Sequence, residues 1–216
     1  MSSTSYVFRY FNTPGFGEAT RLMLLASNSK WTEENPEWPQ AKPDQPFGRL
    51  PVLVEKYADG SPDFVVSESG TIERYLARTL GFFPSDPKQA TLQEQLRDQM
   101  TDITILCMQI RNGANDTIKE KLAELFVKLK EIMPKALENN GSSVSPQSNG
   151  LTYIDFVVYS FFKALLPHCI EKMPEYTDSF KNMWSPEVKK LIANVNAEPS
   201  LQSRVADDKK VFTFLA

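Results

Sequence analysis

The sequence predicts a fold in two parts, a small α/β domain over residues 1–81 and an all-helical domain over residues 91–216. In the first 80 or so residues, short runs of aromatic and β-branched residues alternate with segments of helical spacing. After residue 90, apolar residues recur at helical spacing throughout. Between the two parts, residues 81–87 contain a glycine and two prolines, which end one helical pattern before the next begins. We therefore place a linker at residues 82–90.

Four short runs in the first part are predicted to be strands because aromatic and β-branched residues dominate them: residues 6–11, 30–33, 52–56 and 63–66. Asp59 and Gly60 separate the last two runs, and this pair is typical of a tight hairpin turn. Apolar residues at helical spacing predict one helix from Glu18 and another around Ile72. Residues 34–45 are rich in proline and charge, which indicates an irregular loop or a short helix.

The second part is predicted to be helical on the same grounds. Apolar residues keep helical spacing over residues 92–110 and 118–133. Residues 151–166 are apolar on nearly all sides, which indicates a buried central helix rather than a surface helix. Ser185 followed by Pro186 is typical of a helix start, with serine as the cap and proline in the first turn.

Thr152 and Asp155 match the Thr-x-x-Asp pattern that caps a helix N-terminus. We therefore assign Asp155 to folding rather than to catalysis. The polar segment before it, residues 139–149, is predicted to be a loop.

Composition excludes several classes of protein. The chain has 216 residues, of which 41% are hydrophobic and 24% charged, and these values fit a globular protein with a real core. The net charge of −3 argues against a dedicated nucleic-acid or anionic-membrane binder. No run approaches the roughly 18 apolar residues that a membrane span needs, and the N-terminus is unlike a secretory signal. Cys107 and Cys169 are too few for a disulfide framework, and His168 lies near no ligand cluster that would predict a metal site. We expect a soluble cytoplasmic protein.

Four short motifs carry a family resemblance: Tyr10-Phe-Asn12, Gly17-Glu-x-x-Arg21, Leu50-Pro-Val52 and Glu68-Ser69. Together they resemble the cytosolic glutathione transferase superfamily, in particular its tyrosine-type classes and most closely the sigma class. The resemblance runs nearly the whole length of the chain. It implies a thioredoxin-like first domain and a helical second domain that carries the electrophile pocket. It also implies a cis bond before the proline, although only about one X-Pro bond in twenty is cis in folded proteins.

The resemblance assigns Tyr10 to catalysis, as a hydrogen-bond donor to the glutathione sulfur. A tyrosine at the end of a strand is otherwise usually a core residue. A thiol with a pKa of about 8.5 is mostly protonated at neutral pH, and a donor aimed at the thiolate favours the reactive form. Thr13 is the competing hydroxyl, because other classes of the family place a serine or cysteine close to this helix N-terminus. The simpler interpretation of Thr13 is that it caps the turn.

The resemblance also implies a set of glutathione-binding residues: Trp38, Lys42, Arg49, Leu50, Pro51, Glu68, Ser69 and Asp102. Ser69 opens a helix and would bind the γ-glutamyl carboxylate, with Glu68 near the ammonium group. Trp38 and Lys42 would lie over the glycine carboxylate, and Leu50 would offer its backbone as a neighbouring strand does. Arg49 replaces a commoner glutamine.

Asp102 would reach the partner's glutathione across a two-fold interface, which predicts a homodimer with shared sites. Each of these assignments has a simpler alternative. Ser69 can merely cap its helix. Trp38 can pack while Lys42 is solvated. Asp98 and Asp102, four residues apart, can form an ordinary solvated stripe.

The electrophile pocket is expected to be mostly apolar and to be lined by residues from both domains: Phe16, Ile105, Gln109, Val157, Phe161 and Phe214. Two residues depart from the family pattern. Phe16 stands where several classes carry an arginine near the sulfur, and Gly70 stands where a larger residue is common. The predicted function is conjugation of glutathione to hydrophobic electrophiles, with isomerisation or peroxide reduction as further reactions. Glutathione is the co-substrate, and neither a metal nor a cofactor is expected. The alternative is a structural or ligand-carrying relative with little turnover.

Overall fold

The computed structural model describes residues 4–111, 113, 116–138, 140, 141, 144–166 and 173–205. Its N-terminal part contains one four-stranded sheet in the order β2-β1-β3-β4. The strands are β1 (Thr4–Arg9), β2 (Trp31–Glu34), β3 (Val52–Tyr57) and β4 (Phe64–Ser67). β1 runs parallel to β2 and antiparallel to β3, and β3 pairs antiparallel with β4.

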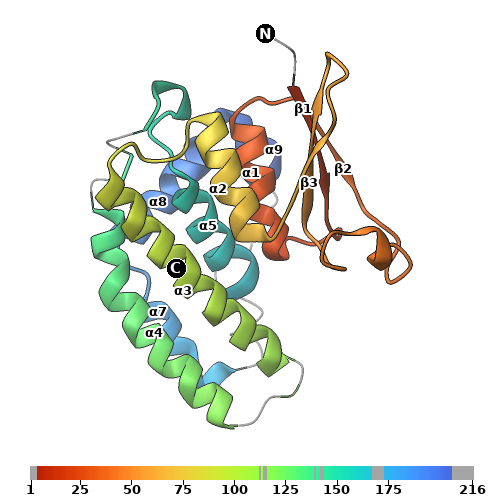
Figure 1. The fold of residues 1–216 in the computed structure, drawn as a ribbon. Coiled ribbons are helices and arrows are strands. Elements are labelled where there is room, and N and C mark those ends of the chain that lie inside the picture. Colours follow the sequence, from red (N-terminus) through yellow and green to blue (C-terminus); the bar gives the residue numbers. More distant parts are fainter. Residues whose placement is uncertain are drawn as a thin grey trace.

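Alternation along β1 determines which face of the sheet meets the main core. Tyr6 and Phe8 are buried in the large core, whereas Val7 joins a smaller cluster with Val52 and Val54. Helices α1 (Glu18–Ala26) and α2 (Ser69–Leu80) lie between the sheet and the rest of the molecule (Figure 1). The strand-helix pattern thus places both helix N-termini at the boundary between the two parts.

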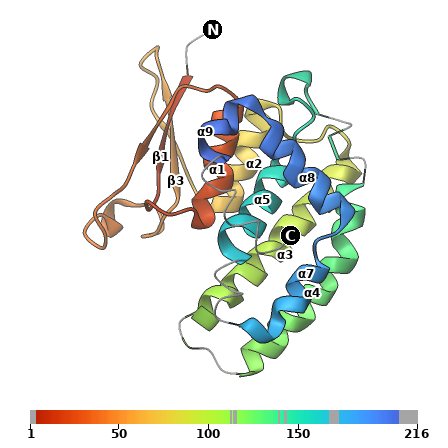
Figure 2. The ribbon, with the colours of Figure 1, turned by 180° about the vertical axis from the view of Figure 1, so that it is seen from behind.

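The second part is helical in all its regular described elements (Figures 1 and 2). Its helices are α3 (Pro87–Arg111), α4 (Asp116–Leu137), α5 (Tyr153–Ser160), α7 (Thr177–Asn182), α8 (Pro186–Ala197) and α9 (Gln202–Val205). A π-helical segment, Phe161–Leu165, continues α5. α5 is buried along nearly its whole length, which confirms the predicted central helix. No helix among the described residues is long and apolar enough to span a membrane.

Both predicted helix caps are confirmed. The Thr152 N–H donates to Asp155 Oδ2 at 2.7 Å, and Asn140 Nδ2 donates to both carboxylate oxygens at 2.9 Å. Burial raises the pKa of Asp155 to about 6, and the hydrogen bonds from Thr152 and Asn140 oppose this rise. At the start of α8, Ser185 Oγ accepts from the Val188 N–H at 3.3 Å.

Several predicted boundaries differ from the structure. β1 covers residues 4–9 rather than 6–11, so Tyr10 lies just past the strand, although its N–H still donates to the Glu34 carbonyl at 3.1 Å. α3 begins at Pro87, so residues 87–90 are helical and the linker is shorter than expected. Proline is tolerated in the first turn of a helix, so Pro87 starts α3 instead of belonging to the linker. His168, Cys169 and Phe214 lie outside the described residues.

Candidate active site

Tyr10 is buried beneath the short turn that connects β1 to α1. Only 5% of its surface is exposed. A Cβ atom at Gly17 would lie 2.4 Å from the tyrosine ring, and one at Gly15 would lie 2.6 Å from Oη. Gly15 also has a φ of +40°, which other residues rarely adopt. The two glycines therefore allow the backbone to close over the tyrosine.

The hydroxyl of Tyr10 is arranged as a hydrogen-bond donor. Its oxygen accepts from the Phe16 N–H at 2.9 Å, which leaves the hydroxyl proton available to another acceptor. Burial raises the pKa of Tyr10, and the Phe16 N–H and the Arg21 guanidinium only partly oppose the rise. The phenol is therefore protonated at neutral pH and can stabilise an anion beside it.

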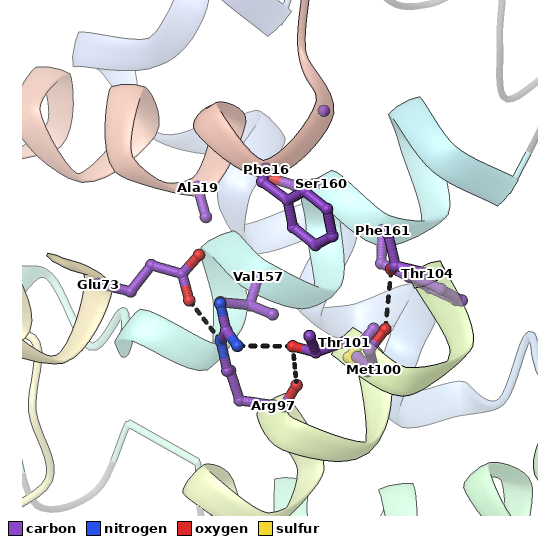
Figure 3. Close-up of a pocket in the computed structure, with 11 residues that line it drawn as sticks. Phe16, Ala19, Glu73, Arg97, Met100, Thr101, Thr104, Val157, Ser160 and Phe161 are labelled. Atoms are coloured by element: carbon purple, nitrogen blue, oxygen red, sulfur yellow. Dashed lines mark hydrogen bonds and ion pairs between the residues drawn. The ribbon is translucent and has the colours of Figure 1, made fainter. Parts of the chain in front are cut away.

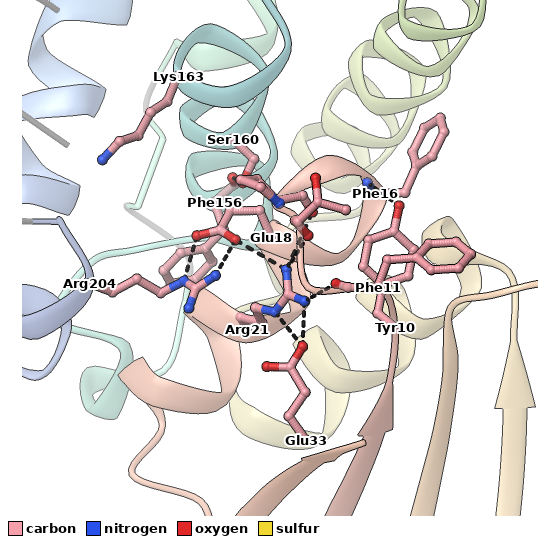
Figure 4. Close-up of polar contacts among 12 residues, drawn as sticks. Tyr10, Phe11, Phe16, Glu18, Arg21, Glu33, Phe156, Ser160, Lys163 and Arg204 are labelled. Carbon is pink, nitrogen blue, oxygen red and sulfur yellow. Dashed lines mark hydrogen bonds and ion pairs between the residues drawn. The ribbon is translucent and has the colours of Figure 1, made fainter. Parts of the chain in front are cut away.

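Arg21 holds the turn that carries Phe16 (Figure 4). Its Nη1 donates to the Thr13 carbonyl and its Nη2 to the Phe11 carbonyl, both at 2.8 Å, and its Nε donates to the Glu33 carboxylate at 2.9 Å. The guanidinium also lies 5.5 Å from the centre of the Tyr10 ring. Thr13 itself is exposed and contributes its backbone carbonyl to this network.

A second side of the site forms where the loop before β3 meets the N-terminus of α2. The Leu50–Pro51 bond is cis, as the resemblance implied. Arg49 Nη2 lies 3.1 Å from Glu68 Oε1, and both side chains are largely exposed. Glu68 has a φ of +70°, a conformation that costs about 1–3 kcal/mol for a residue with a side chain. Strain of this kind is commonly retained at functional sites, which supports a role for this corner.

Ser69 is bonded to a residue that the sequence did not single out. Arg97, on α3, donates from Nη2 to Ser69 Oγ at 3.0 Å and from Nε to Glu73 Oε2 at 2.7 Å (Figure 3 shows the pair with Glu73). A Cβ atom at Gly70 would lie 2.7 Å from the Arg97 guanidinium. The unusual Gly70 was the only sequence signal of this arrangement.

The remaining predicted glutathione residues are more loosely placed. The half-buried Trp38 packs edge-on against Phe11, with ring centres 5.4 Å apart. Lys42 is exposed. Its side chain lies beside Gly48 of the same loop, where an added Cβ atom would be 3.5 Å from Lys42 Cε. Asp102 is exposed on α3. Its neighbour Asp98 is paired with Arg74, with Nη1 and Oδ1 3.4 Å apart.

A cavity of about 40 Å³ lies between the two parts of the molecule (Figure 3). It is lined by Gly15, Phe16, Ala19, Glu73, Arg97, Met100, Thr101, Thr104, Val157, Ser160 and Phe161. Three of these, Phe16, Val157 and Phe161, were predicted. Ligand pockets usually span about 300–1,000 Å³, so the described residues leave room for only a small group here.

Two of the residues predicted for the electrophile pocket on α3 lie outside this cavity. Ile105 and Gln109 are exposed and do not line the cavity, which receives Met100, Thr101 and Thr104 instead. Thr101, Ile105 and Gln109 follow one another at intervals of four residues and share one face of α3, so the two predicted residues lie one and two turns beyond the residue of that face that lines the cavity. The predicted Phe214 lies outside the described residues.

Comparison with known proteins finds relatives that match most of this chain. The family model of the glutathione S-transferase N-terminal domain matches residues 6–78. Glutathione S-transferase 2 of Manduca sexta is 30% identical over 216 residues, covering 91% of this chain and 93% of its own length. Glutathione S-transferase 1 of Ascaris suum is 27% identical over 205 residues, covering 87% and 95%. The solved structure of NaGST-2 superposes with a TM-score of 0.69 at 25% identity, covering 94% of this chain and 96% of its own.

The chain therefore belongs to the glutathione S-transferase family. This confirms the predicted fold class, a thioredoxin-like domain followed by an all-helical domain, and it identifies the protein as a glutathione transferase enzyme.

Proposed function

We propose that the chain binds glutathione with its sulfur at Tyr10 and adds the thiolate to a hydrophobic electrophile. The hydrogen bond from the Phe16 N–H to Tyr10 Oη carries this proposal, because it leaves the phenol proton to stabilise the thiolate. The thiol proton is released to water, and the sulfur forms a bond to the electrophilic carbon with its own electron pair. In a substitution the leaving group departs with the electrons of the broken bond. In an addition the π electrons move to the neighbouring atom, which then takes a proton from water. Isomerisation and peroxide reduction use the same thiolate and belong to the proposal as further reactions.

The rest of glutathione is proposed to extend from Tyr10 toward the N-terminus of α2. The first N–H groups of a helix lack partners within that helix, so Ser69 and the start of α2 suit the γ-glutamyl carboxylate. Glu68 suits the ammonium group, and the backbone of Leu50 suits the cysteinyl part. Trp38 and Lys42 are proposed for the glycine end. Arg49 already forms an ion pair with Glu68, so we propose that it influences glutathione binding through Glu68 rather than by direct contact with the peptide.

We further propose a cytoplasmic, sigma-like homodimer in which Asp102 approaches the partner's glutathione, with no metal or cofactor required. The exposure of Asp102, in contrast to the paired Asp98, supports this role. Light scattering of the purified chain tests the oligomeric state, and Asp102→Asn tests the shared site. A monomer with full glutathione affinity would contradict this part of the proposal.

Steady-state conjugation of glutathione to a chloronitroaromatic compound tests the central claim. We expect Tyr10→Phe to lower kcat/KM by about tenfold or more, which is about 1.4 kcal/mol of transition-state stabilisation. Thr13→Ala is the matched control and should leave turnover unchanged. Equal rates for wild type and Tyr10→Phe would instead assign the chemistry to Thr13 or elsewhere. Glutathione binding without turnover in the wild type would indicate a non-catalytic relative.

A further inference from the structure

Arg97 crosses the boundary between the two parts of the molecule and ends beside the start of α2. It belongs to α3, is only 6% exposed, and hydrogen-bonds Ser69, Glu73 and Thr101. Ser69 and Arg97 are 28 residues apart in the sequence. The helical domain thus supplies a side chain to the corner where we place the γ-glutamyl group.

Gly70 provides the space that Arg97 occupies. A Cβ atom at this position would lie 2.7 Å from both Cζ and Nη1 of Arg97 and 3.0 Å from Nη2. Glycine weakens a helix, so its place in the first turn of α2 needs a packing reason. The guanidinium gives that reason, because it fills the volume that a side chain at position 70 would take.

The contact with Arg97 decides what the Ser69 hydroxyl can do. A serine hydroxyl has one proton to donate and two lone pairs to accept with. An arginine has no acceptor, so the 3.0 Å contact uses a lone pair of Ser69 and leaves its proton for another group. A carboxylate only accepts, so it is a suitable partner for that proton at a helix N-terminus.

Glu73 limits the electrostatic attraction that Arg97 can exert on a bound anion. Its carboxylate is buried and lies 2.7 Å from Arg97 Nε, so it neutralises the guanidinium. The pair therefore offers an approaching anion little net charge. What remains is a fixed direction for the Ser69 hydroxyl.

We propose that Arg97 is a positioning residue that fixes the Ser69 hydroxyl as a donor to the γ-glutamyl carboxylate of glutathione. By this means it determines the preference of the site for thiol ligands that carry this carboxylate. The inference rests on the proposed glutathione site. It concerns binding specificity and not thiolate formation at Tyr10.

The test replaces the whole buried pair, because removal of Arg97 alone would leave Glu73 buried without its cation. Such pairs can often be replaced by apolar residues of similar volume without loss of stability, so Arg97→Met/Glu73→Leu is the variant of choice. Arg74→Met is the matched control, since Arg74 also joins α2 to α3 through Asp98, at 3.4 Å. Calorimetry measures the dissociation constants of glutathione and of 4-aminobutyryl-cysteinylglycine, which lacks only the γ-glutamyl carboxylate.

We expect the double variant to lose about tenfold in affinity for glutathione and less than about twofold for the analogue. The control should preserve the wild-type ratio of the two affinities. Equal losses of affinity for both ligands would assign Arg97 to packing alone and overturn the inference. No loss for either ligand would overturn it as well. A wild type that binds neither ligand would instead reject the proposed glutathione site, and this inference with it.

Ser69→Ala provides an independent check of the route. If Arg97 acts through Ser69, adding Ser69→Ala to the double variant should change glutathione affinity by less than about twofold. In the wild-type background, Ser69→Ala should cost about tenfold. Fully additive losses would show that Arg97 acts by another route, and would overturn the proposal.

Discussion

Two buried arginines support opposite sides of the candidate site, and they differ in the kind of partner they bond. Arg21 lies within the first domain and donates to the backbone carbonyls of Phe11 and Thr13 as well as to Glu33. Arg97 comes from the second domain and bonds the side chains of Glu73, Ser69 and Thr101. Arg21 therefore shapes the chain path around Tyr10, whereas Arg97 orients a side chain.

This difference predicts different tolerance to substitution. The carbonyl partners of Arg21 cannot be removed by a side-chain substitution, so an apolar replacement such as methionine leaves part-buried acceptors without their donor. The ion-pair partner of Arg97 is a side chain and can be replaced together with it. We therefore expect Arg21 to tolerate substitution less well than Arg97, because part of its hydrogen bonding is to backbone.

The largest expected effect is that of Arg21→Met. We expect it to lower the free energy of unfolding by about 5 kcal/mol, the upper end for breaking a buried pair, because carbonyl groups are stranded as well as Glu33. Urea denaturation followed by circular dichroism measures this loss. Adding Glu33→Gln should not restore stability, and a full rescue would show that the carbonyl bonds contribute little.

Arg97→Met is expected to cost less, about 3 kcal/mol, because it strands mainly the Glu73 carboxylate. Here the second substitution should matter. Arg97→Met/Glu73→Leu should return to within about 1 kcal/mol of wild type in the same urea experiment. If the double variant is as unstable as the single one, the contrast between the two arginines fails.

The effect of Gly70→Ala on the free energy of unfolding is expected to differ in sign between the wild type and the Arg97→Met/Glu73→Leu variant. In the wild type the new methyl group meets the guanidinium, and we expect a loss of about 2 kcal/mol from overpacking. In the Arg97→Met/Glu73→Leu background a flexible methionine side chain that can move aside replaces the hydrogen-bonded guanidinium, so alanine should gain up to about 1 kcal/mol from better helix propensity. Thermal denaturation of the four proteins gives the cycle. An equal loss in both backgrounds would place the clash elsewhere.

The smallest expected effect is that of Arg9, a partly exposed arginine in the same domain as Arg21. Arg9 Nε lies 2.7 Å from Glu34 Oε2, with side-chain exposures of 32% and 52%. Solvent screening limits such a pair, so Arg9→Gln should change the free energy of unfolding by less than about 1 kcal/mol. Urea denaturation provides this baseline for Arg21→Met. A loss above about 3 kcal/mol would show that burial is not what separates the two arginines.

Much of the fold could be predicted from local sequence patterns. The strand-helix order, the caps at Thr152 and Ser185 and the buried helix α5 all depend on neighbours within a few residues. The candidate residues Tyr10 and Ser69 came instead from the family resemblance, because a tyrosine at a strand end and a serine at a helix start are otherwise usually a core residue and a cap. The residues of α3 that line the cavity were not predictable to the same accuracy, and the predicted Ile105 is exposed and lies outside it.

The sequence by itself determined the two-part fold class, through hydrophobic periodicity, and a strand that ends close to Tyr10. Only the tertiary structure decided which groups meet at these positions. It placed the Phe16 N–H on the Tyr10 oxygen and the Arg97 guanidinium in the space left by Gly70. The physical reason is that periodicity reports which side of an element is buried, whereas a hydrogen bond depends on positions fixed within a few tenths of an ångström by the packing of distant segments.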